Sequence, residues 1–388
     1  MVFTFWLSLF IVFYTFFGYG IVLYILVTLR ALIKGNRPIP DNKGNWPTVS
    51  LIISAYNEED CIADKIKDTL ALTYPADKLE IIFVTDGSSD RTPEIVAQYP
   101  QIKLMHEAAR KGKLAAIHRV MDYVKSEIVV LTDANTFLNH DALLLLCRHY
   151  ADPKIGAVSG EKRVKIDDVA DATAGEGFYW KYESKLKTWD AELYSIVGAA
   201  GELISYRTAL YEPIPTDTIL DDFMISMLIA EAGYRVVYEP LACATETGSD
   251  NVKEELKRKI RIAAGGIQCI VRLKKVLNPF RNFTLTFQYI SHRVLRWTVT
   301  PFLMILAFVL NAIIAFQTHE LLYEALFAAQ VFFYTLSLLG WIMERQQIKV
   351  KIFFIPYYFC MMNYAVAAGI KRYISKSQSA VWEKSKRR

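Results

Sequence analysis

The sequence predicts an α/β domain with a mostly parallel sheet, flanked at both ends of the chain by apolar helices long enough to cross a membrane. Short β-branched runs alternate with helical patterns through the middle of the 388 residues, and polar residues follow these runs repeatedly. Hydrophobic residues make up 53% of the chain and concentrate towards its two ends. This length and composition allow a large core and two or three structural units.

The clearest strand is the run Ile-Val-Val-Leu-Thr at 128–132, which ends in Asp133, Ala134 and Asn135. Four apolar residues in a row, three of them β-branched, indicate a strand buried on both faces. Ligands bind at the carboxyl ends of strands in an open α/β sheet, and residues two apart in extended backbone point the same way. Asp133 and Asn135 are therefore candidate ligands of a divalent cation, and an ordinary Asx turn is the alternative.

Other predicted strands also end in polar residues. Strands at 48–54 and 79–84 are followed by polar segments at 55–60 and 85–90. This is the arrangement of a nucleotide-binding βαβ sheet. The sequence has no Gly-x-Gly-x-x-Gly fingerprint and no Walker-type loop, which disfavours a dinucleotide-dependent dehydrogenase and a P-loop NTPase. Further strands are predicted at 102–106, 155–159 and 234–239.

Two pairs of charged residues stand at the starts of predicted helices. Lys111 and Lys113 lie where the helix dipole already places positive charge, which an anionic ligand would relieve. A solvated basic turn is the alternative. Asp221 and Asp222 precede a helix over 224–231 and suit helix capping. They also suit general-base chemistry, because repulsion between adjacent carboxylates raises the pKa of one of them.

The first apolar segment, 3–29, has no charged residue and is followed at once by Arg30 and Lys34. Its length predicts a membrane-spanning anchor, with a buried hairpin of soluble helices as the alternative. The basic flank on its carboxyl side predicts an uncleaved anchor whose amino terminus lies outside the cytosol. Segments 299–316 and 321–343 are two further spanning candidates, joined by a short polar turn.

Two more segments near the carboxyl end are predicted to associate with the membrane. Residues 283–297 are aromatic and basic, which indicates an amphipathic helix in the membrane interface, with Arg293, Arg296 and Trp297 as anchors. Segment 352–370 is apolar, but a strongly basic tail follows it, and the positive-inside rule places that tail in the cytosol. A re-entrant or interfacial helix is therefore favoured there over a third carboxyl-side spanning helix.

Five cysteines are widely spaced with no Cys-x-x-Cys pair, so neither a zinc site nor a disulfide framework is suggested and a reducing, cytosolic location is favoured. The net charge of +5 suits an anionic membrane surface better than nucleic acid. The predicted division of the chain is an anchor (1–36), a cytosolic domain (37–280), an interfacial helix (281–298), two transmembrane helices (299–344), and a re-entrant, interfacial or third membrane helix with a basic tail (345–388).

These motifs, in this order and spacing, resemble the membrane-bound family 2 glycosyltransferases, which include the cellulose, hyaluronan, chitin and poly-N-acetylglucosamine synthases. The resemblance covers nearly the whole chain. It implies a GT-A type, Rossmann-like catalytic domain with amino- and carboxyl-terminal transmembrane helices. It also implies a multi-pass protein of the inner (plasma) membrane whose catalytic domain faces the cytosol.

On the donor side, the resemblance implies that Asp86 pairs with the uracil of a UDP-sugar and that Glu58 lies near the ribose. Asp133 and Asn135 stand at the Asp-x-Asp metal motif and would hold Mg²⁺ or Mn²⁺. The neutral amide of Asn135 replaces the second carboxylate and would hold the cation less tightly. The implied nucleotide-binding residues are Ala55, Tyr56, Asn57, Glu58, Asp86, Lys111 and Lys113.

On the acceptor side, Leu-Asp-Asp at 220–222 stands where the family has Thr-Glu-Asp. Asp222, with Asp221 beside it, would be the base that deprotonates the acceptor hydroxyl. Residues 258–262 stand where processive members carry Gln-x-x-Arg-Trp, so Arg258 and Arg261 would bind the leaving diphosphate. Ile replaces the Trp on which the terminal sugar stacks in those members. The implied acceptor loop is Gly198, Ala199, Ala200, Gly201 and Glu202.

The implied activity is inverting transfer of a hexosyl or N-acetylhexosaminyl group from a UDP-sugar to a glycan or to a polyprenyl or glycolipid acceptor, in polysaccharide or glycoconjugate synthesis. A growing exopolysaccharide and a lipid that receives one sugar both stay open as acceptors. A homo-oligomer and a synthase complex also stay open. The alternative from another class is a non-catalytic nucleotide-sugar-binding subunit of a synthase complex. A transporter is disfavoured, because the spanning segments are few and carry no paired intramembrane charge.

Overall fold

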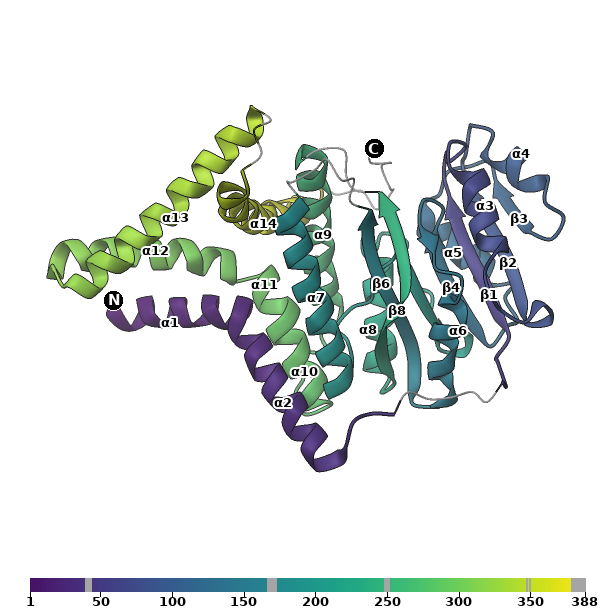
Figure 1. The fold of residues 1–388 in the computed structure, drawn as a ribbon, viewed down its shortest axis with the longest axis horizontal. Coiled ribbons are helices and arrows are strands. Elements are labelled where there is room, and N and C mark those ends of the chain that lie inside the picture. Colours follow the sequence, from purple (N-terminus) through teal and green to yellow (C-terminus); the bar gives the residue numbers. More distant parts are fainter. Residues whose placement is uncertain (39–43, 166–172, 248–251, 347, 349, 378–388) are drawn as a thin grey trace.

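A computed structural model describes residues 1–38, 44–165, 173–247, 252–346, 348 and 350–377. Its centre is an eight-stranded sheet with the order β3-β2-β1-β4-β7-β6-β8-β5 (Figure 1). Strands β1 (Val49–Ala55), β2 (Leu79–Asp86) and β4 (Ile128–Asp133) are parallel, and β7 (Leu203–Arg207) runs antiparallel beside β4. The remaining strands are β3 (Lys103–Glu107), β5 (Phe137–Leu138), β6 (Ile155–Lys165) and β8 (Arg235–Thr247).

The register of the parallel strands brings their polar ends to one edge of the sheet. Ser54 of β1 pairs with Asp133 of β4, and Ala55 pairs with Thr85 of β2. Asp86 follows Thr85 directly, so the ends of three strands that are far apart in sequence lie together. The predicted edge for ligand binding is therefore present.

Helices cover both faces of the sheet, as the alternation of strand and helix patterns predicts. One apolar cluster joins the sheet to α5 (Lys113–Met121), α8 (Asp221–Glu231) and α9 (Val252–Arg272). A second cluster joins the opposite face to α3 (Ile62–Leu70), α4 (Thr92–Ala97) and α6 (Ala142–Cys147). Short 3₁₀ turns at Ala76–Lys78, Arg148–Ala151 and Thr208–Leu210 complete the connections.

The sequence did not predict β7. Its five residues, Leu-Ile-Ser-Tyr-Arg, follow directly after the predicted acceptor loop and have no clear alternation of their own. The strand is stabilised by position instead, because it fills the gap between β4 and β6 and pairs with both. Because β7 runs antiparallel to both neighbours, the sheet is mixed.

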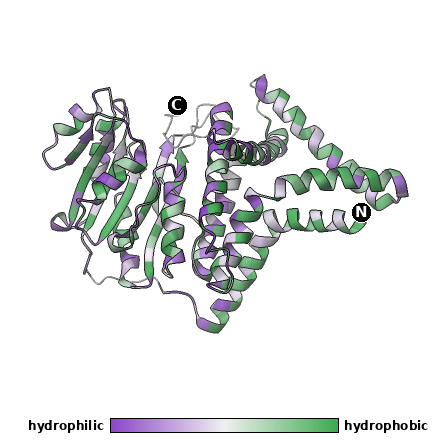
Figure 2. Cartoon of the chain, turned by 180° about the vertical axis from the view of Figure 1, so that it is seen from behind, coloured by the Kyte–Doolittle hydropathy of each residue, from purple (hydrophilic) through white to green (hydrophobic). Residues whose placement is uncertain are grey.

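Among the described residues, four helices are long and apolar enough to cross a membrane, at Val2–Lys34, Thr300–Thr318, Leu321–Arg345 and Ile352–Ile374. The first comprises α1 (Val2–Phe13), a π-helical turn η1 (Tyr14–Gly18) and α2 (Tyr19–Lys34). The others are α12 (Thr300–Thr318), α13 (Leu321–Arg345) and α14 (Lys351–Ile374). Helices α1 and α12 lie side by side, and Figure 2 shows hydrophobic residues along both. The predicted apolar helices at both ends of the chain are confirmed.

Helix α14 is one continuous helix, although Pro356 lies inside it. Near its end, a Cβ added at Gly369 would lie 2.5 Å from the Cβ of Ala263 in α9, so the two helices touch through small residues. Whether α14 crosses a bilayer, lies in its interface or is re-entrant stays a prediction, as do the other domain boundaries. The basic tail from residue 378 lies outside the described residues.

The segment predicted as an interfacial helix folds as α10 (Phe283–Tyr289), a π-helical turn η5 (Ile290–Val294) and α11 (Leu295–Trp297). Its residues Leu285, Tyr289 and His292 are fully or almost fully buried. His292 Nδ1 lies 2.7 Å from a carboxylate oxygen of Asp190 in α7 (Thr173–Leu193), and the Tyr289 ring packs against Phe223 of α8. This segment connects the sheet domain to the apolar helices.

Candidate active site

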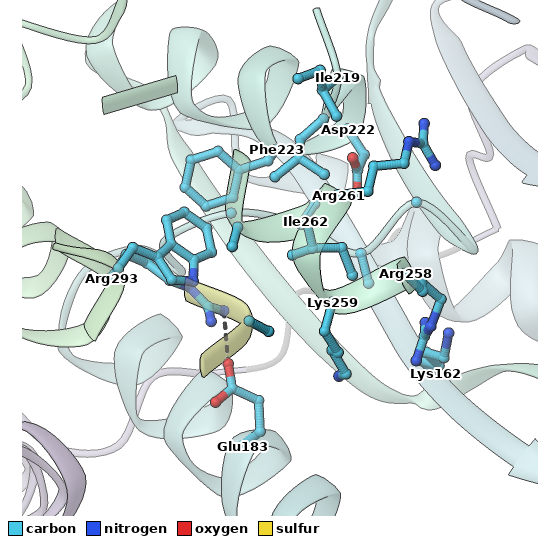
Figure 3. A pocket seen from close by; sticks show the side chains of 18 of the residues that line it. Lys162, Glu183, Ile219, Asp222, Phe223, Arg258, Lys259, Arg261, Ile262 and Arg293 are labelled. Carbon is cyan, nitrogen blue, oxygen red and sulfur yellow. Dashed lines mark ion pairs between the residues drawn. The ribbon is translucent and has the colours of Figure 1, made fainter. Parts of the chain in front are cut away.

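A cavity of about 630 Å³ lies between the sheet edge, α8, α9 and the apolar helices. Figure 3 shows side chains from these elements converging on it, with Asp222 and Arg261 on the same side. The structure thus brings together residues predicted for different roles and separated by more than a hundred positions. The predicted site residues that line the cavity are Lys111, Lys113, Asp133, Gly198, Ala199, Ala200, Gly201, Glu202, Asp221, Asp222, Arg258 and Arg261.

A second cavity, of about 30 Å³, lies beside the first at the ends of β1 and β2, and Ala55, Tyr56 and Asp86 line it. The Asp86 carboxylate accepts hydrogen bonds from the backbone N–H groups of Lys111 (3.0 Å) and Gly112 (2.5 Å). The Arg110 guanidinium lies 3.8 Å from the centroid of the Tyr56 ring. The 110–112 turn therefore covers the pocket predicted to hold the base, and a nucleobase has to displace it.

Asn57 and Glu58 lie in the loop after β1 and make hydrogen bonds within the protein. The Asn57 side-chain carbonyl accepts from the Ser89 N–H at 2.8 Å, and the Glu58 N–H donates to Thr92 Oγ1 at 2.8 Å. The loop is thereby held against the one that follows β2. Asn57 has a φ of 52°, in the left-handed region that asparagine tolerates.

Asp133 ends β4 and Asn135 follows two residues later, at the point where the sequence predicts a divalent cation. Asp133 Oδ1 is 2.6 Å from Lys113 Nζ, so its carboxylate already faces a positive charge. Beneath them the buried Lys65 ammonium donates to the Thr136 carbonyl at 2.5 Å and fixes the turn. The oxygen donors fit Mg²⁺ or Mn²⁺. Among the described residues no group of three or more His, Cys, Asp or Glu side chains forms a metal cluster, so a bound ion needs ligands from the substrate.

Asp222 lies in the first turn of α8, against the acceptor loop. A Cβ added at Gly201 would lie 3.1 Å from Asp222 Oδ2, so the loop backbone passes directly over the carboxylate. Burial and the negative charges of Asp221 and Glu202 raise the pKa of Asp222 to about 7, although Lys113 opposes them. A carboxylate with a pKa near neutrality is suited to removing a proton from a hydroxyl.

Arg258 and Arg261 both line the cavity from α9. Arg258 binds Glu255 on the preceding turn through two hydrogen bonds of 2.9 Å, which hold its guanidinium in place. Ile262, which stands at the position of the expected tryptophan, also lines the cavity. A tryptophan from a different element, Trp297 of α11, lines the cavity. The sequence assigns this residue to membrane anchoring.

The acceptor loop needs glycine at its first position. Gly198 has a φ of +91°, and a Cβ there would lie 2.0 Å from the Phe223 ring. The Ala199 N–H donates to Ser226 Oγ at 3.0 Å, which ties the loop to α8. At its end, Glu202 forms an ion pair with Lys162 of β6. Burial raises the pKa of Glu202, but Lys162 outweighs it and lowers the pKa to about 2, so the carboxylate is charged.

Sequence reasoning missed several charged residues of the cavity. Lys162 binds Glu246 of β8 as well as the acceptor loop, and Lys187 of α7 lines the cavity. Isolated lysines and glutamates in strands and helices form no motif, and only the topology brings them together. Arg293 and Arg296, predicted as interface anchors, bind the buried carboxylate of Glu183 at 2.7 and 3.0 Å and line the cavity. Figure 3 shows the pair of Arg293 and Glu183.

Known proteins resemble this chain in sequence and in fold. Residues 50–214 match the family described as Glycosyl transferase family 2. The poly-beta-1,6-N-acetyl-D-glucosamine synthase of Staphylococcus aureus strain MSSA476 is 26% identical over 231 residues, which are 58% of this chain and 56% of that protein. The synthase of the same name from Staphylococcus epidermidis is 25% identical over the same shares. The chain thus matches little more than half the length of these curated relatives.

A mannosyltransferase from Pyrobaculum calidifontis, solved in complex with GDP-Man and Mn²⁺, has the same overall fold. The two structures superpose with a TM-score of 0.73 at 24% sequence identity, covering 97% of this chain and 100% of that one. The predicted GT-A fold, a Rossmann-like mixed sheet with apolar helices at both ends of the chain, is confirmed. The match to this family covers residues 50–214, from β1 into the segment after β7.

Proposed function

We propose that the protein is an inverting glycosyltransferase that moves a sugar from a UDP-sugar to a glycan or lipid-linked acceptor at the cytosolic face of a membrane. The observation that carries the proposal is the single cavity that contains Asp133, Asp222 and Arg261. A cation-binding group, a base and a cation for the leaving group are the parts that displacement of a nucleoside diphosphate needs. The product is a β-linked saccharide in polysaccharide or glycoconjugate synthesis.

Donor binding uses the sheet edge. The uracil lies at Asp86 after the 110–112 turn has moved, and the diphosphate extends towards Lys113 and Arg261. Asp133 and Asn135 would hold Mg²⁺ or Mn²⁺, which would supply positive charge next to the leaving diphosphate. Support comes from the fold shared with a mannosyltransferase that was solved with Mn²⁺.

Asp222 takes the proton of the attacking hydroxyl. Its position beside the acceptor loop and its pKa of about 7 suit this role. The hydroxyl oxygen forms the new bond to the anomeric carbon while the bond to UDP breaks, and the guanidinium of Arg261 binds the negative charge that UDP carries away. One displacement inverts the configuration and needs no covalent nucleophile.

The membrane location rests on the four candidate spans and on the synthase relatives. All five cysteines are free, which agrees with a reducing cytosolic compartment for the sheet domain. The catalytic cavity opens between the sheet domain and the apolar helices, so the reaction takes place beside the bilayer.

The test is a screen of UDP release by the purified full-length protein over a panel of UDP- and GDP-sugars, with and without EDTA. We expect turnover with a UDP-sugar that falls at least 10-fold in EDTA and returns when Mn²⁺ or Mg²⁺ is added. Equal rates with and without EDTA would contradict the cation site, and turnover of GDP-sugars alone would contradict the uridine assignment.

Substitution Asp222→Asn tests the base. We expect sugar transfer to fall by about 10²–10⁴-fold, because the amide cannot accept the proton, while UDP binding measured by calorimetry stays close to that of the wild type. Asp217→Asn is the matched control, since the Asp217 side chain is 68% exposed and binds Arg272 outside the cavity. Unchanged transfer in the Asp222→Asn variant would remove this residue from the mechanism.

A further inference from the structure

The cavity has a second end that the donor and the base do not use. There its lining comes from apolar membrane helices: Phe16 and Phe17 of η1, and Ile355, Tyr358, Phe359, Met362 and Val366 of α14. Phe17 is 61% exposed and Ile355 is 57% exposed, so side chains of the lining also lie on the outer surface of these helices. The cavity therefore continues from the catalytic residues to a surface that faces lipid.

Cations gather where this apolar end meets the catalytic end. Lys187, Arg293 and Arg296 line the cavity there, and Glu183 is the carboxylate that binds both arginines. The charges of Glu161 and Glu202 also act on Lys187, although neither forms an ion pair with it among the described residues, so the positive cluster is Lys187, Arg293 and Arg296. These residues belong to α7, η5 and α11, and they are distinct from the lysines and arginines assigned to the donor.

Lys187 is the member of this cluster that has no acceptor for its charge. Its side chain is 7% exposed, and within the described part of the chain its ammonium group makes neither a hydrogen bond nor an ion pair. The nearest recorded contact of Nζ is the ring of Tyr238, 5.5 Å from the centroid. Burial lowers the pKa of Lys187, although Glu183 opposes the shift. Burying an ammonium group without a partner is costly, and an anionic ligand removes that cost.

We propose that the acceptor is a saccharide linked to a lipid through a phosphate or diphosphate, with the phosphate at Lys187 and the hydrocarbon chain between η1 and α14. The proposal rests on the proposed function and names its acceptor class. A free glycan offers neither the negative charge that Lys187 lacks nor the hydrocarbon that the apolar lining accommodates. A neutral glycolipid offers the hydrocarbon but not the negative charge.

The catalytic base and the proposed phosphate site belong to one electrostatic environment. The charge of Glu202 acts on both Lys187 and Asp222, and all three residues line the cavity. The saccharide of the acceptor then lies over the acceptor loop, with a hydroxyl at Asp222. That hydroxyl loses its proton to Asp222 and attacks the anomeric carbon of the donor, UDP leaves, and the lipid phosphate is not consumed.

The backbone at the apolar end supports a route for the lipid chain. Both π-helical turns among the described residues, η1 and η5, supply residues to the cavity, namely Phe16, Phe17 and Arg293. Such turns occur often at functional sites, because they displace side chains from the regular helical positions. Phe16 packs edge-on against Phe359 with ring centroids 4.7 Å apart, so a lipid chain that passes between η1 and α14 has to displace this contact.

The test is a binding measurement that does not depend on the identity of the sugar. Full-length protein in phosphatidylcholine nanodiscs is saturated with UDP, which fills the donor site, and bound ligands are counted by native mass spectrometry. The probes are geranylgeranyl diphosphate, geranylgeraniol and inorganic diphosphate. We expect the first probe to bind at least 10-fold more tightly than either of the others, because only it has both a chain and a charge.

Substitution Lys187→Met should lower the affinity for geranylgeranyl diphosphate by about 10- to 100-fold, because it removes one charge-assisted hydrogen bond. Lys187→Arg should keep most of the affinity. Lys185→Met is the matched control on the same helix, because Lys185 is exposed and lies over the Trp189 ring. The melting temperature of Lys187→Met should equal or exceed that of the wild type, which excludes misfolding as the cause.

Three results would overturn the proposal. Equal binding of inorganic diphosphate would make the site one for free anions. Equal binding of dioleoylphosphatidylglycerol, added as a fourth probe, would make it one for any anionic lipid. An unchanged affinity in Lys187→Met would remove the lysine from the site. Failure of the wild type to bind UDP is a separate result, and it would overturn the proposed function rather than this acceptor class.

Discussion

At the scale of single residues, the cavity is an arrangement of opposed charges in which each group sets the protonation of the next. Lys113 binds Asp133 and also opposes the rise in the pKa of Asp222. Glu202 is held charged by Lys162 and raises the pKa of Asp222 in turn. The candidate base therefore owes its pKa to burial and to charged neighbours on α8, the acceptor loop and α5.

The rate of sugar transfer should depend on pH through Asp222. Below about pH 7 the carboxyl of Asp222 is protonated and cannot accept a proton, so kcat should fall about 10-fold for each further pH unit. Substitution Glu202→Gln removes a charge that raises this pKa, so the midpoint of the acid limb should move to lower pH. The measurement is the pH profile of kcat with saturating donor.

Glu231→Gln serves as the control for the pH profile, because Glu231 lies at the far end of α8 and binds Lys275. Its midpoint should match that of the wild type. A midpoint in Glu202→Gln that stays in place or moves to higher pH would show that Asp222 is not the group that titrates. The test depends on the pH of the midpoint and not on how far kcat falls below it.

At the scale of elements, the acceptor loop is fixed by close packing against α8. Substitution Gly198→Ala should lower the free energy of unfolding by about 2–4 kcal/mol, because the new methyl group meets the Phe223 ring and the φ of +91° is strained for alanine. Chemical denaturation followed by tryptophan fluorescence measures the change. The loop positions Asp222, so transfer activity should fall with stability.

The control for Gly198 is Gly233→Ala. Gly233 has a φ of +97° but nothing within 4 Å of an added Cβ, so only the backbone strain remains. A loss of about 1 kcal/mol is expected there. Equal losses of unfolding free energy in the two variants would mean that the clash of the new methyl group with Phe223 costs nothing.

The elements also show what sequence patterns can predict. Strands β1, β2 and β4 were predictable, because β-branched runs followed by polar residues mark buried parallel strands that end at a binding edge. Strand β7 was not, since its five residues derive their structure from two neighbouring strands. The site divides in the same way. Asp133 and Asp222 belong to motifs, whereas Lys162 and Lys187 become neighbours of the site only through the topology.

At the scale of the whole molecule, a buried polar cluster joins the anchor helix to the sheet domain. The Asp190 carboxylate of α7 accepts hydrogen bonds from Tyr19 of α2 at 2.5 Å and from Gln288 of α10 at 3.0 Å. His292 of η5 lies 2.7 Å from its other oxygen. One fully buried carboxylate thus connects three helices.

Substitution Asp190→Asn should lower the free energy of unfolding by about 2–4 kcal/mol, because it leaves a buried histidine and its neighbours without the charge that they face. The change is measured by thermal denaturation in nanodiscs. Glu192→Gln is the control two residues away, with an exposed side chain and an expected change within about 0.5 kcal/mol. Indistinguishable melting of the two variants would contradict a structural role for the cluster.

Helices α14 and α11 form one wall of the cavity, so a water-soluble fragment that lacks them would have an incomplete cavity. A fragment excised at residues 37–280 keeps Asp86, Asp133 and Asp222 but loses Trp297, which packs on Gly266, and the α14 segment that packs on Ala263. Such a fragment should still bind UDP, yet its reaction chamber would stand open to solvent along one side. Assays on the isolated domain would then measure hydrolysis of the donor in place of sugar transfer.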